Sequence, residues 1–206
     1  MAALDYPLAP EKPYPAALKA VCDSYREIVA NAARFRCDPA KVALGGDSSG
    51  GNLALAAALM LHEEGLKPYS IVAYYPVTEA RDDNSESWRQ FAEGCGMDAA
   101  FMDACNAAYL QGHTWRDKFA SPMCATDREL RALPPVHIFA ADRDVLRDQG
   151  KRFAERLEKA GGRVRYELPR GTTHLFVTVP GQSAAFCRAV EFAAEALSFS
   201  RRAPHL

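Results

Sequence analysis

A serine between two glycines carries the strongest chemical signal in the sequence. The motif Gly46-Asp-Ser-Ser-Gly50 lies between a short apolar run at 42–45 and a helical pattern that starts near Ser49. In a strand-to-helix turn, this spacing strains the backbone of the central residue and points its hydroxyl out of the sheet. It therefore predicts Ser48 as a nucleophile, with glycine at 46 and 50 because side chains there would collide. The Ser49 N–H, at a helix N-terminus, would stabilise an oxyanion.

The same glycines have an alternative interpretation. The pairs Gly45-Gly46 and Gly50-Gly51 stand between a strand and a helix, which is also where a phosphate-binding loop lies. The segment lacks the lysine of a P-loop and the glycine spacing of a dinucleotide-binding fingerprint. Nucleophilic serine chemistry is therefore favoured over phosphate binding.

A serine hydroxyl becomes a good nucleophile only when a base takes its proton. The usual base is a histidine that is oriented by a carboxylate, each at the carboxyl end of a later strand. His174 lies in a loop directly after the strand-like run 164–168, which predicts it as the base; the alternative is a solvated surface histidine. The other histidines lie mid-helix, in a long insertion, inside a strand and in the tail: His62, His113, His137 and His205.

Three aspartates compete for the role of the carboxylate. Asp142, Asp144 and Asp148 all follow the apolar run 136–141. Each could instead cap the helix that comes next, and Asp148 fits best as such a cap or as an exposed first-turn charge. The chain order serine, aspartate, histidine is that of α/β hydrolases. The residues alone leave the choice among the three open.

Strand-like and helix-like segments alternate along the chain. Short apolar runs at 42–45, 70–75, 136–141 and 164–168 are separated by three-and-four apolar spacing around 18–32, 53–60, 153–160 and 186–197. This alternation predicts βαβ units, and so an α/β fold with a mostly parallel sheet and flanking helices. Residues 78–135 interrupt it as a helical insertion with a predicted helix at 98–110. Such a segment typically lines a substrate pocket; a packed crossover is the alternative.

Composition limits the remaining possibilities. The 206 residues, 49% of them hydrophobic, predict one domain over 1–206. A net charge of -1 argues against a nucleic-acid partner. No apolar run predicts a membrane span and no signal peptide is apparent. The six cysteines lack CxxC pairing, which favours reduced thiols in a cytoplasmic protein over a disulfide framework or a metal site.

Further blocks extend the serine motif into a family pattern. They read Asp5-Tyr-Pro-Leu-Ala-Pro-Glu11, Asp144-Val-Leu-Arg-Asp-Gln-Gly150 and His174-Leu-Phe176. With Gly46-Asp-Ser-Ser-Gly-Gly51, the chain resembles bacterial hormone-sensitive-lipase-type esterases, which are α/β hydrolases. The resemblance places the acid at Asp144. It implies hydrolysis of a small short-acyl ester through a Ser-His-Asp triad and an acyl-enzyme, without metal or cofactor.

The resemblance also suggests which residues surround the substrate. Trp88 and Phe91 follow the strand-like run 70–75, in the region that lines the acyl pocket in the family; simple core packing is the alternative for both. Asp47 and Leu175 flank the nucleophile and the base, and they complete the pocket candidates. Leu175 stands where the family has glycine, so it puts bulk beside the base. Pro7 and Val145 are two further departures, in place of arginine and proline.

One family element is absent from the chain. The family's His-Gly-Gly-Gly loop, which supplies two oxyanion N–H groups, precedes the block at Asp5, and no histidine here is followed by glycine. The strand bearing that loop would lie between a strand ending at Tyr6 and the run 42–45. We therefore expect a truncated α/β-hydrolase fold in which these two strands pair directly or leave a damaged edge, and homo-oligomers formed through that edge.

The missing loop also opens an alternative function. With Ser49 as the one oxyanion donor, the chain could be a catalytically impaired or inactive fragment that serves as a ligand-binding or interaction module. A third hypothesis is another acyl transfer on the same fold, such as cleavage of a peptide, lactone or amide.

Overall fold

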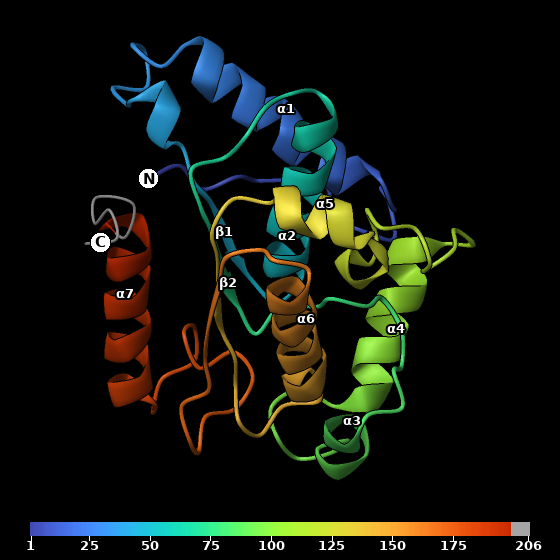
Figure 1. Ribbon diagram of the computed structural model, residues 1–206. Coiled ribbons are helices and arrows are strands. Elements are labelled where there is room, and N and C mark those ends of the chain that lie inside the picture. Colours follow the sequence, from blue (N-terminus) through green and yellow to red (C-terminus); the bar gives the residue numbers. More distant parts are fainter. Residues whose placement is uncertain (199–206) are drawn as a thin grey trace.

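The computed structural model describes residues 1–198 and arranges them around a four-stranded parallel sheet (Figure 1). Its strands are β1 (Leu44–Asp47), β2 (Ile71–Tyr74), β3 (Val136–Phe139) and β4 (Val164–Glu167), in the order β1-β2-β3-β4. Each strand pairs in parallel with the next one along the chain. The predicted α/β class and parallel sheet are therefore confirmed, with β1 starting two residues later than its apolar run.

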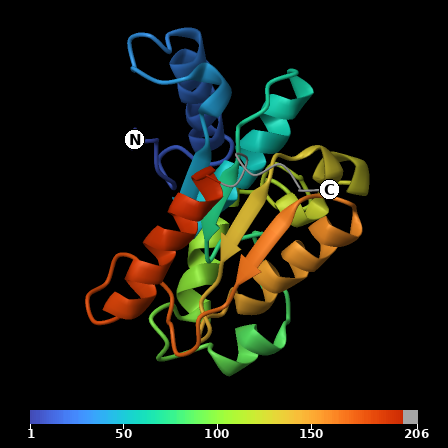
Figure 2. The ribbon, with the colours of Figure 1, turned by 60° about the vertical axis from the view of Figure 1, so that its left-hand side comes forward.

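Helices cover both faces of the sheet. On one face lie α1 (Ala16–Ala30), α2 (Ser49–Glu63), α5 (Asp127–Ala132) and α6 (Arg147–Lys159), whereas α7 (Ser183–Ser198) packs on the other (Figures 1 and 2). Two single turns of 3-10 helix occupy Pro39–Lys41 and Pro122–Cys124. The predicted helices 18–32, 53–60, 153–160 and 186–197 correspond to α1, α2, α6 and α7.

The alternation of side chains along the strands builds the two cores. Ile71, Val136 and Ile138 point to the face covered by α2 and α6, where they are fully buried. Their neighbours Val72 and Phe139 point the other way and pack with α7. A strand that is covered on both faces has apolar residues at successive positions. For this reason the apolar runs of the sequence predicted β2 and β3.

The segment 78–135 contains helices and, within the described residues, no strand. It comprises α3 (Glu86–Gln90), α4 (Ala99–Leu110), the second 3-10 turn and α5. Two arginines of α6 hold it in place: Arg152 pairs with Glu79 and Asp83, and Arg156 donates to backbone carbonyls near the 3-10 turn. The insertion is thus anchored along α6.

The prediction of a strand that ends at Tyr6 was wrong, whereas the open sheet edge expected as the alternative to direct pairing is present in the described residues. Residues 1–8 form no strand, so the expected strand ending at Tyr6 and its direct pairing with β1 are absent. Tyr6 packs instead against the cluster between α1 and α2. Within residues 1–198, β1 pairs with β2 alone, and Gly45 in its middle is exposed. A strand forms only where a neighbour satisfies its N–H and C=O groups, and residues 1–8 have no such neighbour.

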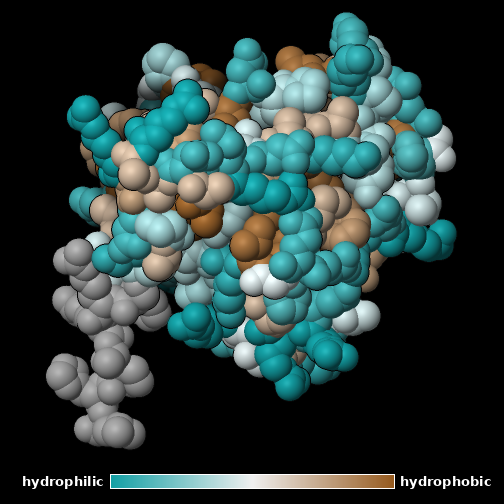
Figure 3. Space-filling view, turned by 90° about the horizontal axis from the view of Figure 1, so that it is seen from above, coloured by the Kyte–Doolittle hydropathy of each residue, from teal (hydrophilic) through white to brown (hydrophobic). Residues whose placement is uncertain are grey.

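No helix in residues 1–198 is long and apolar enough to cross a membrane. Figure 3 shows the top of the molecule as it is oriented in Figure 1. This face is largely hydrophilic, and polar side chains interrupt its hydrophobic patches. Helix α7 carries three of the large apolar side chains that remain exposed, Phe186, Val190 and Leu197.

Acid should weaken the fold through His137. Its side chain is 2% exposed in β3, beside Phe192. Burial, together with Arg165 and Arg163, lowers the pKa of His137 from 6.5 to about 4. The unfolded chain therefore binds more protons than the native one between these two values, and stability falls as pH drops from 6.5 to about 4. The loss should reach at most about 3 kcal/mol.

Urea unfolding of wild type and His137→Phe at pH 7.0, 6.0 and 5.0 measures how the free energy of unfolding depends on pH. We expect the free energy of unfolding to depend on pH less steeply in the variant. The control His62→Gln changes an exposed histidine and should keep the wild-type slope. Equal slopes in all three proteins would contradict the prediction.

Candidate active site

The serine of the Gly-x-Ser-x-Gly motif occupies a sharp turn between β1 and α2. Ser48 has φ 51° and ψ -115°, a conformation that L-residues rarely adopt. Hydrogen bonds fix the turn, because the Ser48 N–H donates to the carbonyl of Tyr74 and the Ser48 carbonyl accepts from Asn52 and Val77. This is the strained strand-to-helix geometry that the motif predicts, and it leaves the Ser48 hydroxyl free to face the neighbouring loops.

The glycines of the motif do not share one role. A Cβ at Gly46 would lie 2.4 Å from the backbone carbon of Gly50, so that the turn would have to shift to accept it. A Cβ at Gly50, in contrast, would meet nothing within 4 Å. The expectation that side chains at both positions would collide is therefore wrong for Gly50. Gly51 is the second restricted position, since its Cβ would lie 2.8 Å from Pro76.

A hydrogen-bonded chain of three side chains crosses the carboxyl edge of the sheet. The Nε2 of His174 lies 3.0 Å from the Ser48 Oγ, and its Nδ1 lies 2.7 Å from the Asp144 Oδ2. The side chains of His174 and Asp144 are both 0% exposed, whereas Ser48 is half-buried. The structure thus brings the predicted nucleophile, base and acid together, with a pathway for the serine proton to the imidazole.

The three aspartates that could act as the acid have different partners in the structure. Asp144 alone of the three contacts His174, and its Oδ1 accepts from the Leu146 N–H. Asp142 instead accepts from the Gly171 N–H and so ties the acid loop to the base loop. Asp148, in the first turn of α6, exchanges hydrogen bonds with Ser87 of α3.

Asp148 anchors the insertion to the acid loop. Burial opposes ionisation of this carboxyl, but the Arg147 side chain and the Ser87 N–H outweigh it, so the pKa of Asp148 is lowered. Ser87 also donates from its hydroxyl to the Val145 carbonyl. Helix α3 is therefore fixed directly against the residues that follow Asp144.

Sequence reasoning missed Tyr75. Its ring packs against the His174 imidazole, with ring centroids 4.6 Å apart and the planes inclined at 51°, and Phe176 contacts it in a T-shaped arrangement. Tyr75 has φ 34°, and its N–H donates to the Phe139 carbonyl. Burial, with Asp47 nearby, raises the pKa of its phenol, so the ring stays neutral. Its place directly after β2, at the carboxyl edge, was the available signal.

The pocket candidates lie in different surroundings. Trp88 is 4% exposed and packs with Val145 and Leu146, which favours the core-packing alternative. Phe91 is partly buried under the guanidinium of Arg147, 5.0 Å from its ring centroid. Asp47 is half-buried beside Tyr75. Leu175 has φ 64° and lines an open depression of about 560 Å³ next to the base.

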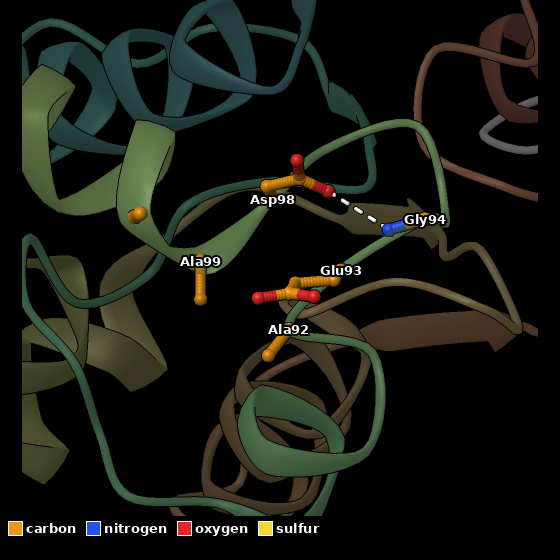
Figure 4. Close-up of a pocket in the computed structure, with 6 residues that line it drawn as sticks. Ala92, Glu93, Gly94, Asp98 and Ala99 are labelled. Atoms are coloured by element: carbon orange, nitrogen blue, oxygen red, sulfur yellow. Dashed lines mark hydrogen bonds between the residues drawn. The ribbon is translucent and has the colours of Figure 1, made fainter.

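That depression adjoins a second one, of about 650 Å³, at the start of α4 (Figure 4). Gly94 and Asp98 line both, and the Gly94 N–H donates to the Asp98 carboxylate at 3.0 Å. Figure 4 shows the carboxylates of Glu93 and Asp98 in the same hollow, with Ala92 and Ala99 beside them. The described residues contain no group of three or more His, Cys, Asp or Glu side chains placed to hold a metal ion.

Comparison with known proteins places this chain in a family. A family described by the alpha/beta hydrolase fold matches residues 1–178. The chain belongs to this family. The family resemblance drawn from the motif blocks, to hormone-sensitive-lipase-type esterases, is thereby confirmed.

Individual α/β hydrolases are similar along nearly the whole chain. The carboxylesterase NlhH of Mycobacterium tuberculosis is 34% identical over 98% of this chain. An α/β hydrolase from the Lake Arreo metagenome is 35% identical over 96% of it, with a TM-score of 0.88. An esterase of Rhizomucor miehei is 28% identical over 95%, with a TM-score of 0.85. The chain covers 63%, 62% and 64% of these α/β hydrolases, respectively.

The two motif glycines give a matched pair of variants. Gly46→Ala should lower the free energy of unfolding by about 3 kcal/mol, because the added methyl overlaps backbone atoms of Gly50. Gly50→Ala should leave stability equal or raise it by up to about 1 kcal/mol, since it places alanine in the first turn of α2 with open space around it. Urea denaturation compares them; equal effects of the two substitutions would contradict this account of the turn.

Proposed function

We propose that the chain is a serine carboxylesterase that hydrolyses small short-acyl esters through an acyl-enzyme. The hydrogen-bonded chain Ser48–His174–Asp144 is the observation that carries this proposal. Ser48 Oγ attacks the ester carbonyl while His174 Nε2 takes its proton. His174 then gives that proton to the leaving alcohol, and Ser48 is left acylated. Water next gives a proton to His174 Nε2 as it attacks the acyl carbon, and the acid is released when His174 returns that proton to the Ser48 Oγ. Asp144 holds the imidazole orientation and stabilises the imidazolium.

The Ser49 N–H supports the charge that develops on the carbonyl oxygen. It lies in the first turn of α2, where helix N–H groups have no partner within the helix and the helix dipole favours an anion. Because each oxyanion donor contributes about 10²–10³ in rate, a site that relies on this one donor should turn over more slowly than a site with three. None of these steps needs a metal or cofactor.

The alternative is a catalytically impaired module that binds ligands or partners. The absence of any His-Gly pair in the sequence favours it, because the family's oxyanion loop contains such a pair. The fully buried His174–Asp144 pair favours the enzyme, because a binding module has no use for a buried carboxylate aimed at an imidazole. We therefore place the esterase first.

Hydrolysis of p-nitrophenyl butyrate by the purified chain tests the proposal. Ser48→Ala should reduce the rate to background, and Asp144→Asn should reduce kcat by about 10³- to 10⁴-fold with the serine still in place. Ser198→Ala, which removes an exposed hydroxyl at the end of α7, serves as the control and should keep full activity. A folded wild type that is no faster than Ser48→Ala would overturn the esterase proposal for this chain.

We further propose that copies of the chain associate through the outer edge of β1. That edge presents unpaired backbone groups around the exposed Gly45, and β1 has no charged residue before Asp47 to discourage pairing. Light scattering over a 100-fold dilution range should show a mass that exceeds the monomer and falls on dilution. Gly45→Pro, which removes one N–H from this edge, should shift the distribution toward monomer. A constant monomer mass would overturn this.

A further inference from the structure

The backbone around Tyr75 is tied to two of the segments that carry the triad. The Tyr75 N–H donates to the carbonyl of Phe139, the last residue of β3, at 2.8 Å. The carbonyl of Tyr74, directly before it, accepts the Ser48 N–H at 2.9 Å. This short stretch of chain is therefore bonded to the nucleophile turn and to the strand that leads to the acid loop.

Tyr75 keeps a large side chain where the backbone favours glycine. Its φ of 34° is positive, and a bulky residue with a positive φ is an outlier. Such a conformation persists only when the surroundings enforce it, and it is often found at functional sites. The side chain is 2% exposed and reaches the base loop, where it packs against His174 and Phe176.

Two hydrogen bonds leave the His174 imidazole free to rock. Its Nδ1 is bonded to the Asp144 carboxylate and its Nε2 to the Ser48 hydroxyl, which fixes two atoms of the ring. The ring can still turn about the line that joins them, and this bends both hydrogen bonds, which weaken steeply when bent. The Tyr75 ring limits this motion, because its centroid lies 4.6 Å from that of the imidazole.

The same ring lies beside the charge that the base acquires. When His174 holds the serine proton, its imidazolium is shielded from water, because the side chain is 0% exposed. A cation within about 6 Å of an aromatic centroid is attracted by the π electrons, and the attraction is stronger where water is excluded. The Tyr75 hydroxyl takes no part in the hydrogen bonds of the triad, since the two nitrogens of His174 are bonded to Ser48 and Asp144.

We propose that Tyr75 is a positioning residue for the base. Its ring keeps the His174 Nε2 aligned with the Ser48 hydroxyl and stabilises the imidazolium, and it acts through His174 without touching the ester. The effect on rate rests on the proposed esterase function. The effect on the imidazole can be measured without turnover, so the two can fail separately.

Proton NMR of the full chain tests the position of the imidazole without a substrate. The Nδ1 proton between His174 and Asp144 should give a resonance far downfield of the amide protons, and His174→Gln identifies it by removing it. Tyr75→Phe keeps the ring and should retain this resonance. Tyr75→Leu should broaden it beyond detection, because a mobile imidazole exchanges this proton with water faster. If Tyr75→Leu does not fold, Tyr75→Met replaces it, since methionine adapts to irregular space.

Hydrolysis of p-nitrophenyl butyrate measures the consequence for rate. Tyr75→Leu should lower kcat about 10- to 100-fold and leave KM within about twofold, because alignment is lost and substrate binding is not. Tyr75→Phe should keep the wild-type rate. Phe192→Leu is the matched control: it removes a fully buried ring from the same apolar cluster, and its ring contacts are with His137 and Phe139. It should retain both the resonance and the rate.

Several outcomes would overturn the inference. They are a wild type without the resonance, a resonance that survives in Tyr75→Leu, and, in an active enzyme, a rate loss no larger than that of Phe192→Leu. Loss of the resonance in Tyr75→Phe would overturn it as well, because the role would then belong to the hydroxyl. A wild type that hydrolyses no ester, with the resonance lost in Tyr75→Leu and kept in Phe192→Leu, would overturn the proposed esterase and leave the positioning role of Tyr75 established.

Discussion

The position of the Ser48 hydroxyl depends on a backbone turn that leaves no space for a side chain at residue 46. The positive φ of Ser48 is unfavourable, and the turn persists because three hydrogen bonds tie it to Tyr74, Asn52 and Val77. Two of these partners belong to β2 or to the chain just after it. The side-chain amide of Asn52 extends the link by donating to the carbonyls of Val77 and Ala120. The nucleophile is therefore held by the sheet and by the insertion together.

The base and the acid reach the same point because parallel strands end at one edge. The loops after β3 and β4 are joined to each other: Arg143 bridges to Thr173, and Asp142 accepts from Gly171. This matters energetically, because a carboxylate that is 0% exposed is tolerated only when it is fully hydrogen-bonded. Asp144 has His174 and the Leu146 N–H as hydrogen-bond partners. The joined loops therefore position Asp144 and His174 and also offset the desolvation cost of burying the carboxylate.

How much could be predicted depended on whether the relevant contacts were local. The strand–turn–helix around Ser48 and the loop position of His174 follow from neighbouring residues, so the sequence was sufficient for them. Asp142, Asp144 and Asp148 stand within one loop, and only tertiary geometry shows which one faces the imidazole. The family resemblance placed the acid at Asp144, where periodicity could not.

Other features depend on distant packing. The contact between the tilted rings of Tyr75 and His174 joins residues 99 positions apart, from two loops that no periodicity connects. The motif implies the same steric restriction at Gly46 and Gly50, so it could not predict the open space around Gly50. The expected strand near Tyr6 failed for a related reason: strand propensity is realised only when a neighbouring strand pairs with it, and residues 1–8 have none in this fold.

The open edge and the oxyanion site are two consequences of one structural fact. Strand β1 ends at Asp47, directly before the nucleophile, and its outer side pairs with nothing in residues 1–198. A strand added along that side would end or begin beside Ser48, so that its backbone N–H groups would approach the place where the ester oxygen becomes charged. Completion of the sheet and completion of the oxyanion site are thus geometrically coupled. Whatever segment pairs with β1 would both satisfy its free backbone groups and strengthen the electrostatics at Ser48.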